Sequence, residues 1–146
     1  MTSSSRRHWC VGLAAACALA PWSIAAVAQG TSPKNQIVIQ VSDDDPAKWN
    51  LALNNARNLQ QDLGADGVEI EIVAYGPGIG MLKIESQVSQ RVNDALKSGV
   101  KLLACENTMR GQRLARADML ASIGYVPAGV VEIMKRQQQG WAYLRP

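Results

Sequence analysis

Cys105 is the residue of this chain most capable of chemistry, because few of the usual catalytic side chains are available elsewhere. The only histidine, His8, and the other two cysteines, Cys10 and Cys17, lie close to the N-terminus. A short apolar run over residues 102–105 predicts a buried strand, and the polar residues after it are typical of a helix start. Unpaired N–H groups and a partial positive charge at a helix N-terminus favour the thiolate, which attacks electrophiles and carries sulfur.

The first 28 residues have the layout of a cleavable export signal. Arg6 and Arg7 precede an apolar stretch over residues 9–20, and small residues lead up to Ala28. A permanent membrane anchor needs roughly 20 apolar residues, so this stretch is too short to be one. We therefore expect cleavage after Ala28 and a periplasmic protein. A twin-arginine signal and a lipoprotein box at Cys17 are weaker alternatives, since each motif is only partly present.

Loss of these residues leaves a chain suited to one compact domain, residues 29–146. Of the 15 Lys and Arg, 13 remain against 12 Asp and Glu, and a net charge near +1 gives no reason to expect nucleic acid as a partner. Cys105 becomes the only cysteine, so it cannot form an intramolecular disulfide, although oxidising compartments favour paired cysteines. Its thiol is expected to be free, capped or bonded to another molecule.

Strand and helix signals alternate along the remaining chain. Strands are expected over residues 36–41, 68–75, 100–104, 125–126 and 141–144. Helices are expected over residues 46–63, from Ile84 to Gly99, in the stretch with Arg110, Arg113 and Arg116, over residues 118–122, and from Gly129 to Gln139. Because parallel strands need crossover connections and helices supply them, the alternation predicts a doubly wound, mainly parallel α/β sheet of about five strands.

Several local signals fix the ends and exposure of these elements. Asp45 is expected to cap a helix whose first residue is Pro46, and Gly64 to stop it. Glu69 and Glu71 alternate with apolar residues, which indicates a strand near an edge or on a partly exposed face.

Three features follow strands at their carboxyl ends, where ligands bind in such sheets. They are Cys105, the glycine loop of residues 76–80 and the acidic residues 43–45. The loop lacks the Lys-Ser/Thr tail and third glycine of a nucleotide-binding turn, so a close backbone approach to a pocket is favoured. Capping and a solvated loop explain the acidic run more simply than a metal does. We expect neither a cofactor nor a metal.

Ordered motifs along the chain resemble those of the DsrE/DsrF-like family of small sulfur-relay proteins. They are residues 41–46 with Trp49 and Asn50, residues 75–78, residues 104–109, and residues 126–132 followed by 138–143. The resemblance implies a flavodoxin-like fold, assembly into trimers or hexamers, and a cysteine that accepts and passes on persulfide sulfur. Cys105 matches that cysteine. The best-understood relay members are cytoplasmic, so the export signal leaves the sulfur donor, the acceptor and the pathway open.

The predicted site is therefore Cys105 as the sulfur-carrying residue, with a pocket formed by Asn107, Thr108, Gly76, Gly78 and Arg110. Its partners would be sulfur donor and acceptor proteins or small sulfur species. A buried structural cysteine in a non-catalytic module that binds a small ligand or a partner is the alternative. A redox thiol is disfavoured because the mature chain has no resolving cysteine.

Side chains outside this site carry weaker signals. Arg110 and Arg113 are read as a solvated helix face, or as groups that hold an anionic sulfur species or lower the thiol pKa. Asn50, Asn54 and Asn58 form a polar stripe, for which exposure or a subunit contact is expected before pocket lining. We expect Trp141 and Tyr143 to point to one side of the last strand and to pack between subunits.

Overall fold

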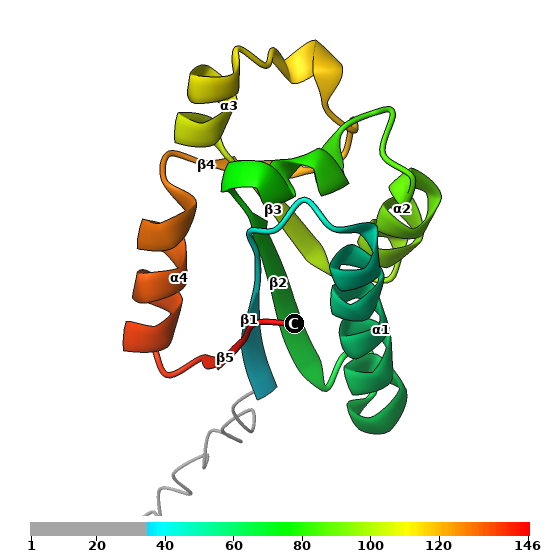
Figure 1. The fold of residues 1–146 in the computed structure, drawn as a ribbon. Coiled ribbons are helices and arrows are strands. Elements are labelled where there is room, and N and C mark those ends of the chain that lie inside the picture. Colours follow the sequence, from blue (N-terminus) through cyan, green and yellow to red (C-terminus); the bar gives the residue numbers. More distant parts are fainter. Residues whose placement is uncertain (1–34) are drawn as a thin grey trace, which may run out of the picture. The chain divides into compact units, whose positions relative to one another are not determined.

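The computed structural model describes residues 35–146, so the expected export signal and its cleavage site lie outside the described residues. Five strands, all paired in parallel, form one sheet in the order β4-β3-β2-β1-β5 (Figure 1). The strands are β1 (Asn35–Val41), β2 (Val68–Ala74), β3 (Lys101–Cys105), β4 (Gly124–Val126) and β5 (Ala142–Leu144). The predicted doubly wound α/β fold is confirmed.

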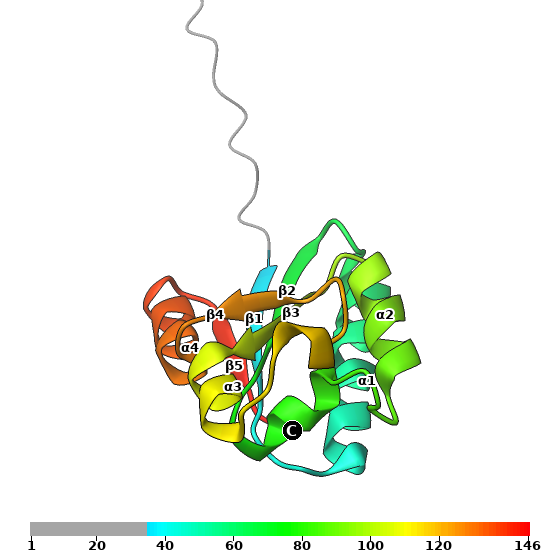
Figure 2. The same cartoon turned by 90° about the horizontal axis from the view of Figure 1, so that it is seen from above.

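Helices cover both faces of this sheet. They are α1 (Pro46–Leu63), α2 (Ser89–Lys97), α3 (Glu106–Gln112) and α4 (Gly129–Gln138), with short 3-10 helices η1 (Gly76–Leu82) and η2 (Arg116–Asp118). Figures 1 and 2 show α1 and α2 on one face and α4 on the other. Strands β1 to β4 advance stepwise across the sheet, and α4 then carries the chain back from edge strand β4 to edge strand β5. Because such crossovers are right-handed, the return connection must use the opposite face.

Helix α1 forms as the sequence predicts. Asp45 Oδ1 accepts a hydrogen bond of 2.8 Å from the Ala47 N–H, and Pro46 is the first helical residue. Gly64 ends the helix with a φ of 80°, which a residue with a Cβ rarely adopts. The buried face of α1 belongs to the main core, on one face of the sheet, whereas a smaller core lies between the sheet and α4 on the other face.

The central position of β2 corrects the expectation of an edge strand. β2 pairs with β1 on one side and β3 on the other, and the Glu71 side chain is fully buried. Arg136 of α4 covers this carboxylate with two hydrogen bonds, from Nε at 3.1 Å and from Nη2 at 2.8 Å. At Glu71 the alternation therefore reflects a buried ion pair, whereas the Glu69 side chain is partly exposed, as expected.

Three expected helices differ in extent. The helix expected to include Arg110, Arg113 and Arg116 ends at Gln112, because Arg113 is left-handed with a φ of 56°. Ile84 is exposed and precedes α2, which begins at Ser89. The Ile84 N–H donates to the Asp118 carbonyl at 3.0 Å. Asp118 ends η2 rather than beginning a helix, and its carboxylate accepts from the Ala115 N–H at 2.7 Å. The predicted turn after Tyr75 is the 3-10 helix η1.

The last strand also differs from expectation. Trp141 is buried within the chain, against Val38 and Ile133, so it is not available to pack between subunits as predicted. Tyr143 is exposed, and its hydroxyl donates to Gln40 Oε1 at 2.6 Å. Within residues 35–146, no helix has both the length and the apolar character of a membrane span.

Candidate functional site

Cys105 occupies the carboxyl end of β3, where the direction of the chain changes. It is the last residue of the strand, it caps α3, and it pairs in register with Val126 of β4. The connection after β4 leads to α4 on one face of the sheet, whereas the connections after β1 and β2 lead to α1 and α2 on the other face (Figure 1). Crevices form at such switch points in open α/β sheets. The thiol is 5% exposed, so it lies just inside this edge.

The sulfur atom also faces the start of a second helix. The Gly129 N–H, in the first residue of α4, donates to Cys105 Sγ at 3.2 Å. The first N–H groups of a helix have no partner within the helix, and together they carry a partial positive charge. Cys105 therefore lies at the N-termini of two helices, of which the sequence predicted only α3.

Gly129 allows α4 to approach this closely. A Cβ atom at this position would lie 3.1 Å from both Tyr75 Cβ and Val73 Cγ1. Gly129 falls within the family motif of residues 126–132, but its sequence neighbours do not indicate a contact with the sulfur. The signal that could have found it is a glycine at the first position of a helix that immediately follows a strand end.

The glycine loop and α3 are joined beside the thiol. The Gly76 N–H donates to Thr108 Oγ1 at 2.9 Å, and Gln112 Nε2 donates to the Gly76 carbonyl at 3.1 Å. Gly76 has a φ of 53°. The structure therefore brings two of the predicted pocket residues, Gly76 and Thr108, into contact with each other, and the Thr108 hydroxyl also lies at the Cys105 sulfur.

The pKa of the Cys105 thiol lies below its ordinary value because two opposing influences do not cancel. Burial is the largest influence and raises the pKa. Hydrogen bonds from the Thr108 hydroxyl and the Gly129 N–H lower the pKa, and the N–H groups of Thr108 and Asn107 lower it by smaller amounts. The Asn107 N–H also donates to the Pro127 carbonyl at 3.1 Å. The net effect favours the thiolate.

The other predicted pocket residues have different surroundings. Gly78 packs against the end of β1, since a Cβ there would lie 2.5 Å from the Val41 carbonyl oxygen. Asn107 and Arg110 are exposed, and Arg110 Nη2 donates to Asn107 Oδ1. Arg113 is also exposed and ends α3 with a φ of 56°. The side chains of Asn107, Arg110 and Arg113 therefore lie at the surface.

The acidic run after β1 serves local structure. Asp45 caps α1, and Asp43 forms ion pairs with Lys48 at 3.1 Å and Arg145 at 3.4 Å. The Lys48 hydrogen bond is the main reason that the pKa of Asp43 lies below its ordinary value. Across residues 35–146, no group of three or more His, Cys, Asp or Glu side chains is arranged to hold a metal ion.

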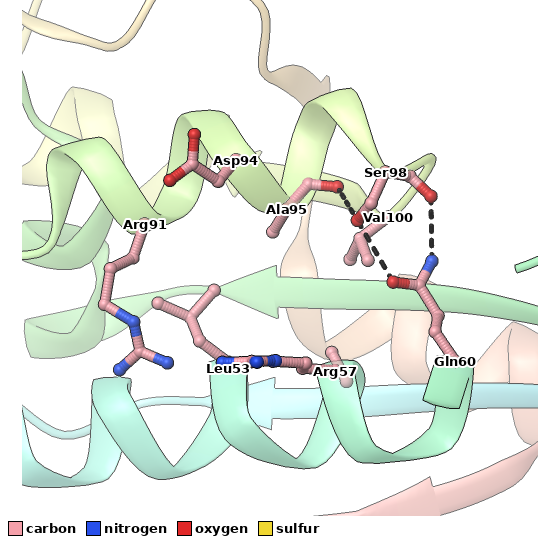
Figure 3. A pocket seen from close by; sticks show the side chains of 9 residues that line it. Leu53, Arg57, Gln60, Arg91, Asp94, Ala95, Ser98 and Val100 are labelled. Carbon is pink, nitrogen blue, oxygen red and sulfur yellow. Dashed lines mark hydrogen bonds between the residues drawn. The ribbon is translucent and has the colours of Figure 1, made fainter. Parts of the chain in front are cut away.

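Two hollows lie away from Cys105. One is a groove between α1 and α2 (Figure 3), and the other borders α2 near Ser122. None of the predicted site residues lines either hollow. The site at Cys105 is thus defined by a buried sulfur and its donors.

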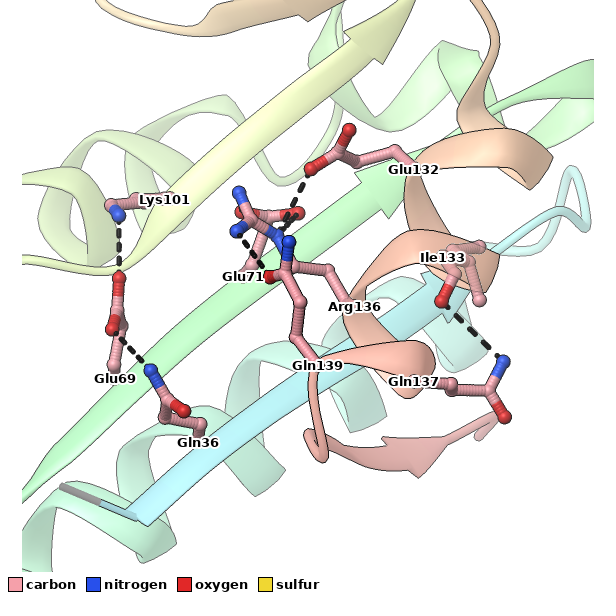
Figure 4. A network of polar contacts seen from close by, with 9 residues as sticks. All are labelled: Gln36, Glu69, Glu71, Lys101, Glu132, Ile133, Arg136, Gln137 and Gln139. Carbon is pink, nitrogen blue, oxygen red and sulfur yellow. Dashed lines mark hydrogen bonds and ion pairs between the residues drawn. The ribbon is translucent and has the colours of Figure 1, made fainter. Parts of the chain in front are cut away.

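A polar network lies under α4, on the same face as the smaller core (Figure 4). Arg136 pairs with Glu71 at 2.8 Å and with Glu132 at 2.9 Å, and its guanidinium lies 4.6 Å from the Trp141 ring centroid. Beside it, Glu69 accepts from Lys101 at 2.6 Å and from Gln36 at 3.0 Å. This network fixes α4 on β2, and so helps to place the Gly129 N–H at the sulfur.

A buried thiol at the carboxyl edge of a five-stranded parallel sheet places the protein among the doubly wound α/β proteins. Residues 35–146 match the model of the DsrE/DsrF-like family, and the chain belongs to that family. This confirms the resemblance found in the sequence.

Solved structures show the same fold. The chain is similar to MTH1491 from Methanobacterium thermoautotrophicum, a protein of unknown function, with 37% identity over 77% of this chain and 100% of that chain and a TM-score of 0.74. BT1422 from Bacteroides thetaiotaomicron, also of unknown function, is 16% identical, with 77% and 95% of the two chains covered and a TM-score of 0.58. The second likeness concerns the fold alone. No curated protein is similar enough to match.

Proposed function

We propose that the protein is a periplasmic sulfur carrier, in which the Cys105 thiolate takes up sulfane sulfur as a persulfide and passes it on. The observation that carries this proposal is the position of Sγ at two helix N-termini, with the Gly129 N–H donating to it at 3.2 Å. Membership of the DsrE/DsrF-like family supports a sulfur-relay role. The export-signal pattern of the first 28 residues supports the location.

The proposed transfer needs no oxidant. The Cys105 thiolate attacks the outer sulfur of a persulfide donor, an S–S bond forms to Sγ, and the donor's own S–S bond breaks, so that the donor leaves as a thiolate. Transfer to an acceptor thiolate repeats these steps in reverse roles. The Gly129 N–H and the Thr108 hydroxyl stabilise negative charge on Sγ before the attack.

The low exposure of the thiol supports a second candidate function. At 5% exposure, Cys105 also fits a buried structural residue in a non-catalytic module that binds a small ligand or a partner. Sulfur loading would require the segments around Cys105 to move far enough to admit a donor. Accessibility of the thiol therefore separates the two candidates.

Assembly into a homo-oligomer, a trimer or a hexamer, is part of the proposal. Helix α4 exposes apolar side chains that a subunit contact would cover, with Val130 62% exposed and Met134 49% exposed. Native mass spectrometry of the purified protein measures the assembly state. A monomer under these conditions would contradict this part of the proposal alone.

Intact mass spectrometry of protein from a periplasmic extract tests the main proposal. The wild type and Cys105→Ser are compared before and after exposure to polysulfide, and a gain of whole sulfur atoms, removed by a reductant, is expected on the wild type only. The same spectrum reports whether the chain starts after Ala28. Equal loading of Cys105→Ser would refute the carrier. No loading of an alkylatable Cys105 would favour the binding module.

A further inference from the structure

The groove between α1 and α2 is a second concave site, separate from Cys105. Its volume is about 340 Å³, which is within the range of small-molecule sites. Four apolar residues lie along it, three from the two helices and one from the residue just before β3: Leu53, Ala56, Ala95 and Val100. Leu53, Ala56 and Val100 are buried, so the groove has a firm apolar floor.

Hydrogen bonds between the two helices hold both ends of the groove in place. At one end, Gln60 Nε2 donates to the Ser98 carbonyl at 2.8 Å, and Ser98 Oγ donates to Gln60 Oε1 at 3.0 Å. At the other end, Arg91 of α2 donates to Asn50 Oδ1, and to Asn54 Oδ1 at 2.7 Å. The asparagine stripe of α1 thus orients an arginine. A ligand would find the groove already formed, which lowers the entropic cost of binding.

Two arginines and one carboxylate, that of Asp94, line this groove, so its net charge is positive. The oxygens that orient Arg91 belong to neutral amides, so they fix the guanidinium without cancelling its charge. Arg57 lines the groove from α1, and neither arginine forms an ion pair with any part of residues 35–146. Figure 3 shows Arg91 reaching toward α1, whereas the Asp94 carboxylate is directed away from α1. Asp94 accepts from Gln90 at 3.1 Å and pairs with Lys97 at 3.8 Å.

We propose that this groove binds a small organic anion, with its oxyanion head group at Arg57 and Arg91 and its apolar body on the floor formed by Leu53, Ala56 and Val100. Guanidinium groups suit carboxylates and related oxyanions because they offer several N–H donors in a planar array. An apolar floor beside two cations selects a ligand that has both parts. This site is independent of the sulfur-carrier proposal.

Calorimetric titration of the full chain with hexanoate, benzoate and hexanesulfonate tests the site. At least one is expected to bind saturably, and hexanol and inorganic sulfate, which each lack one of the two parts, are expected to bind more weakly. Arg57→Gln and Arg91→Gln should each weaken binding about tenfold or more, as loss of a charged hydrogen bond does. Arg113→Gln is the matched control, because it removes the same charge from an exposed position outside the groove.

Arg57→Gln gives the firmer test, because no hydrogen bond between α1 and α2 depends on Arg57, whereas Arg91→Gln removes two. Cys105→Ser should bind the anions as the wild type does. Two results would overturn the proposal: no saturable binding of any of the three anions up to about 10 mM, or equal affinities in Arg57→Gln and Arg113→Gln.

Discussion

Cys105 and Glu71 are two buried acids of this sheet whose pKa values shift in opposite directions. Both lie on adjacent central strands, at 5% and 0% exposure, and burial is the largest influence on each and raises its pKa. For Cys105, hydrogen bonds from Thr108 and from backbone N–H groups outweigh burial, so the pKa is lowered. For Glu71, burial outweighs the hydrogen bonds from Arg136, so the pKa stays raised.

The difference lies in how the compensating charge is shared. Cys105 receives hydrogen-bond donors from two helix starts, and burial is the influence that opposes them. Arg136 must serve Glu132 as well as Glu71, and the negative charge of Glu132 itself raises the pKa of Glu71. The fold holds the backbone N–H groups at Cys105 in place, whereas the single guanidinium of Arg136 pairs with two carboxylates. The first arrangement suits a reactive group, and the second suits a structural one.

Arg136→Met should cause the largest effect, because it leaves Glu71 buried without a partner. We expect a loss of about 3–5 kcal/mol in the free energy of unfolding at pH 7, as for other broken buried pairs. The native pKa of Glu71 is raised, so its contribution to stability is present below the unfolded value, about 4.3, and is lost as the pH rises through the native value. The cost of Arg136→Met should therefore shrink in acid. Urea unfolding across this pH range measures it.

Arg113→Met is the control for this variant, because it removes the same charge at an exposed position. Its expected effect is within about 0.5 kcal/mol. An Arg136→Met protein as stable as this control, or one whose deficit did not change with pH, would show that Arg136 does not compensate Glu71.

Thr108→Val should have an intermediate effect, and it acts on the thiol. The variant loses a hydrogen bond to sulfur, so the pKa of Cys105 should rise and its alkylation at neutral pH should slow. It also leaves the Gly76 N–H without its acceptor, for a stability cost of about 1 kcal/mol. The pH dependence of Cys105 alkylation, followed on the Cys105 peptide by mass spectrometry, measures the first effect.

Thr108→Ser keeps the hydroxyl and should retain the wild-type profile. Because the native pKa of Cys105 is lowered, its ionisation contributes stability above the unfolded thiol value, about 8.5, and that contribution is lost as the pH falls through the native value. Thr108→Val should therefore gain less stability than Thr108→Ser in alkaline solution. Identical alkylation profiles for Val and Ser would contradict the role of the hydroxyl.

The sequence sufficed for the fold because its signals were local. The Asp45 cap, Pro46 and Gly64 bound α1, and β-branched runs separated by helices specify parallel strands. Ile84 and Asp118 were misread because they bond to each other's segment across the chain, a tertiary contact that no local pattern reports. The same reason explains Trp141, whose burial depends on α4 and β1 together.

The candidate site was only partly predictable. Cys105 at a strand end before a helix is a local feature, and so is Thr108 in the following turn. Gly129 lies 24 residues away, and its N–H reaches the sulfur only because β4 pairs beside β3 and α4 starts at that edge. The alternation along β2 predicts the same role for Glu69 and Glu71. The two residues differ only through their partners on other elements, Lys101 and Arg136, which no pattern within β2 reports.

Lys101→Met should have the smallest effect, and it tests whether burial separates these two glutamates. The Lys101–Glu69 pair is short, 2.6 Å, but the side chains are 52% and 27% exposed, so water screens it. We expect a loss of no more than about 1 kcal/mol. Hydrogen bonds from Lys101, then from Gln36, lower the pKa of Glu69, so its contribution to stability is present above the unfolded value and is lost as the pH falls through the native one.

Salt distinguishes the two variants more sharply than acid does, since both deficits shrink as the pH falls. Added salt weakens an exposed pair, so the deficit of Lys101→Met should disappear at about 1 M salt, where the screening length is about 3 Å. The deficit of Arg136→Met should persist, because Glu71 is shielded from ions as well as from water. Urea unfolding of both variants at low and high salt measures this. Equal salt dependence would contradict this role of burial and would mean that the two carboxylates of β2 are screened alike.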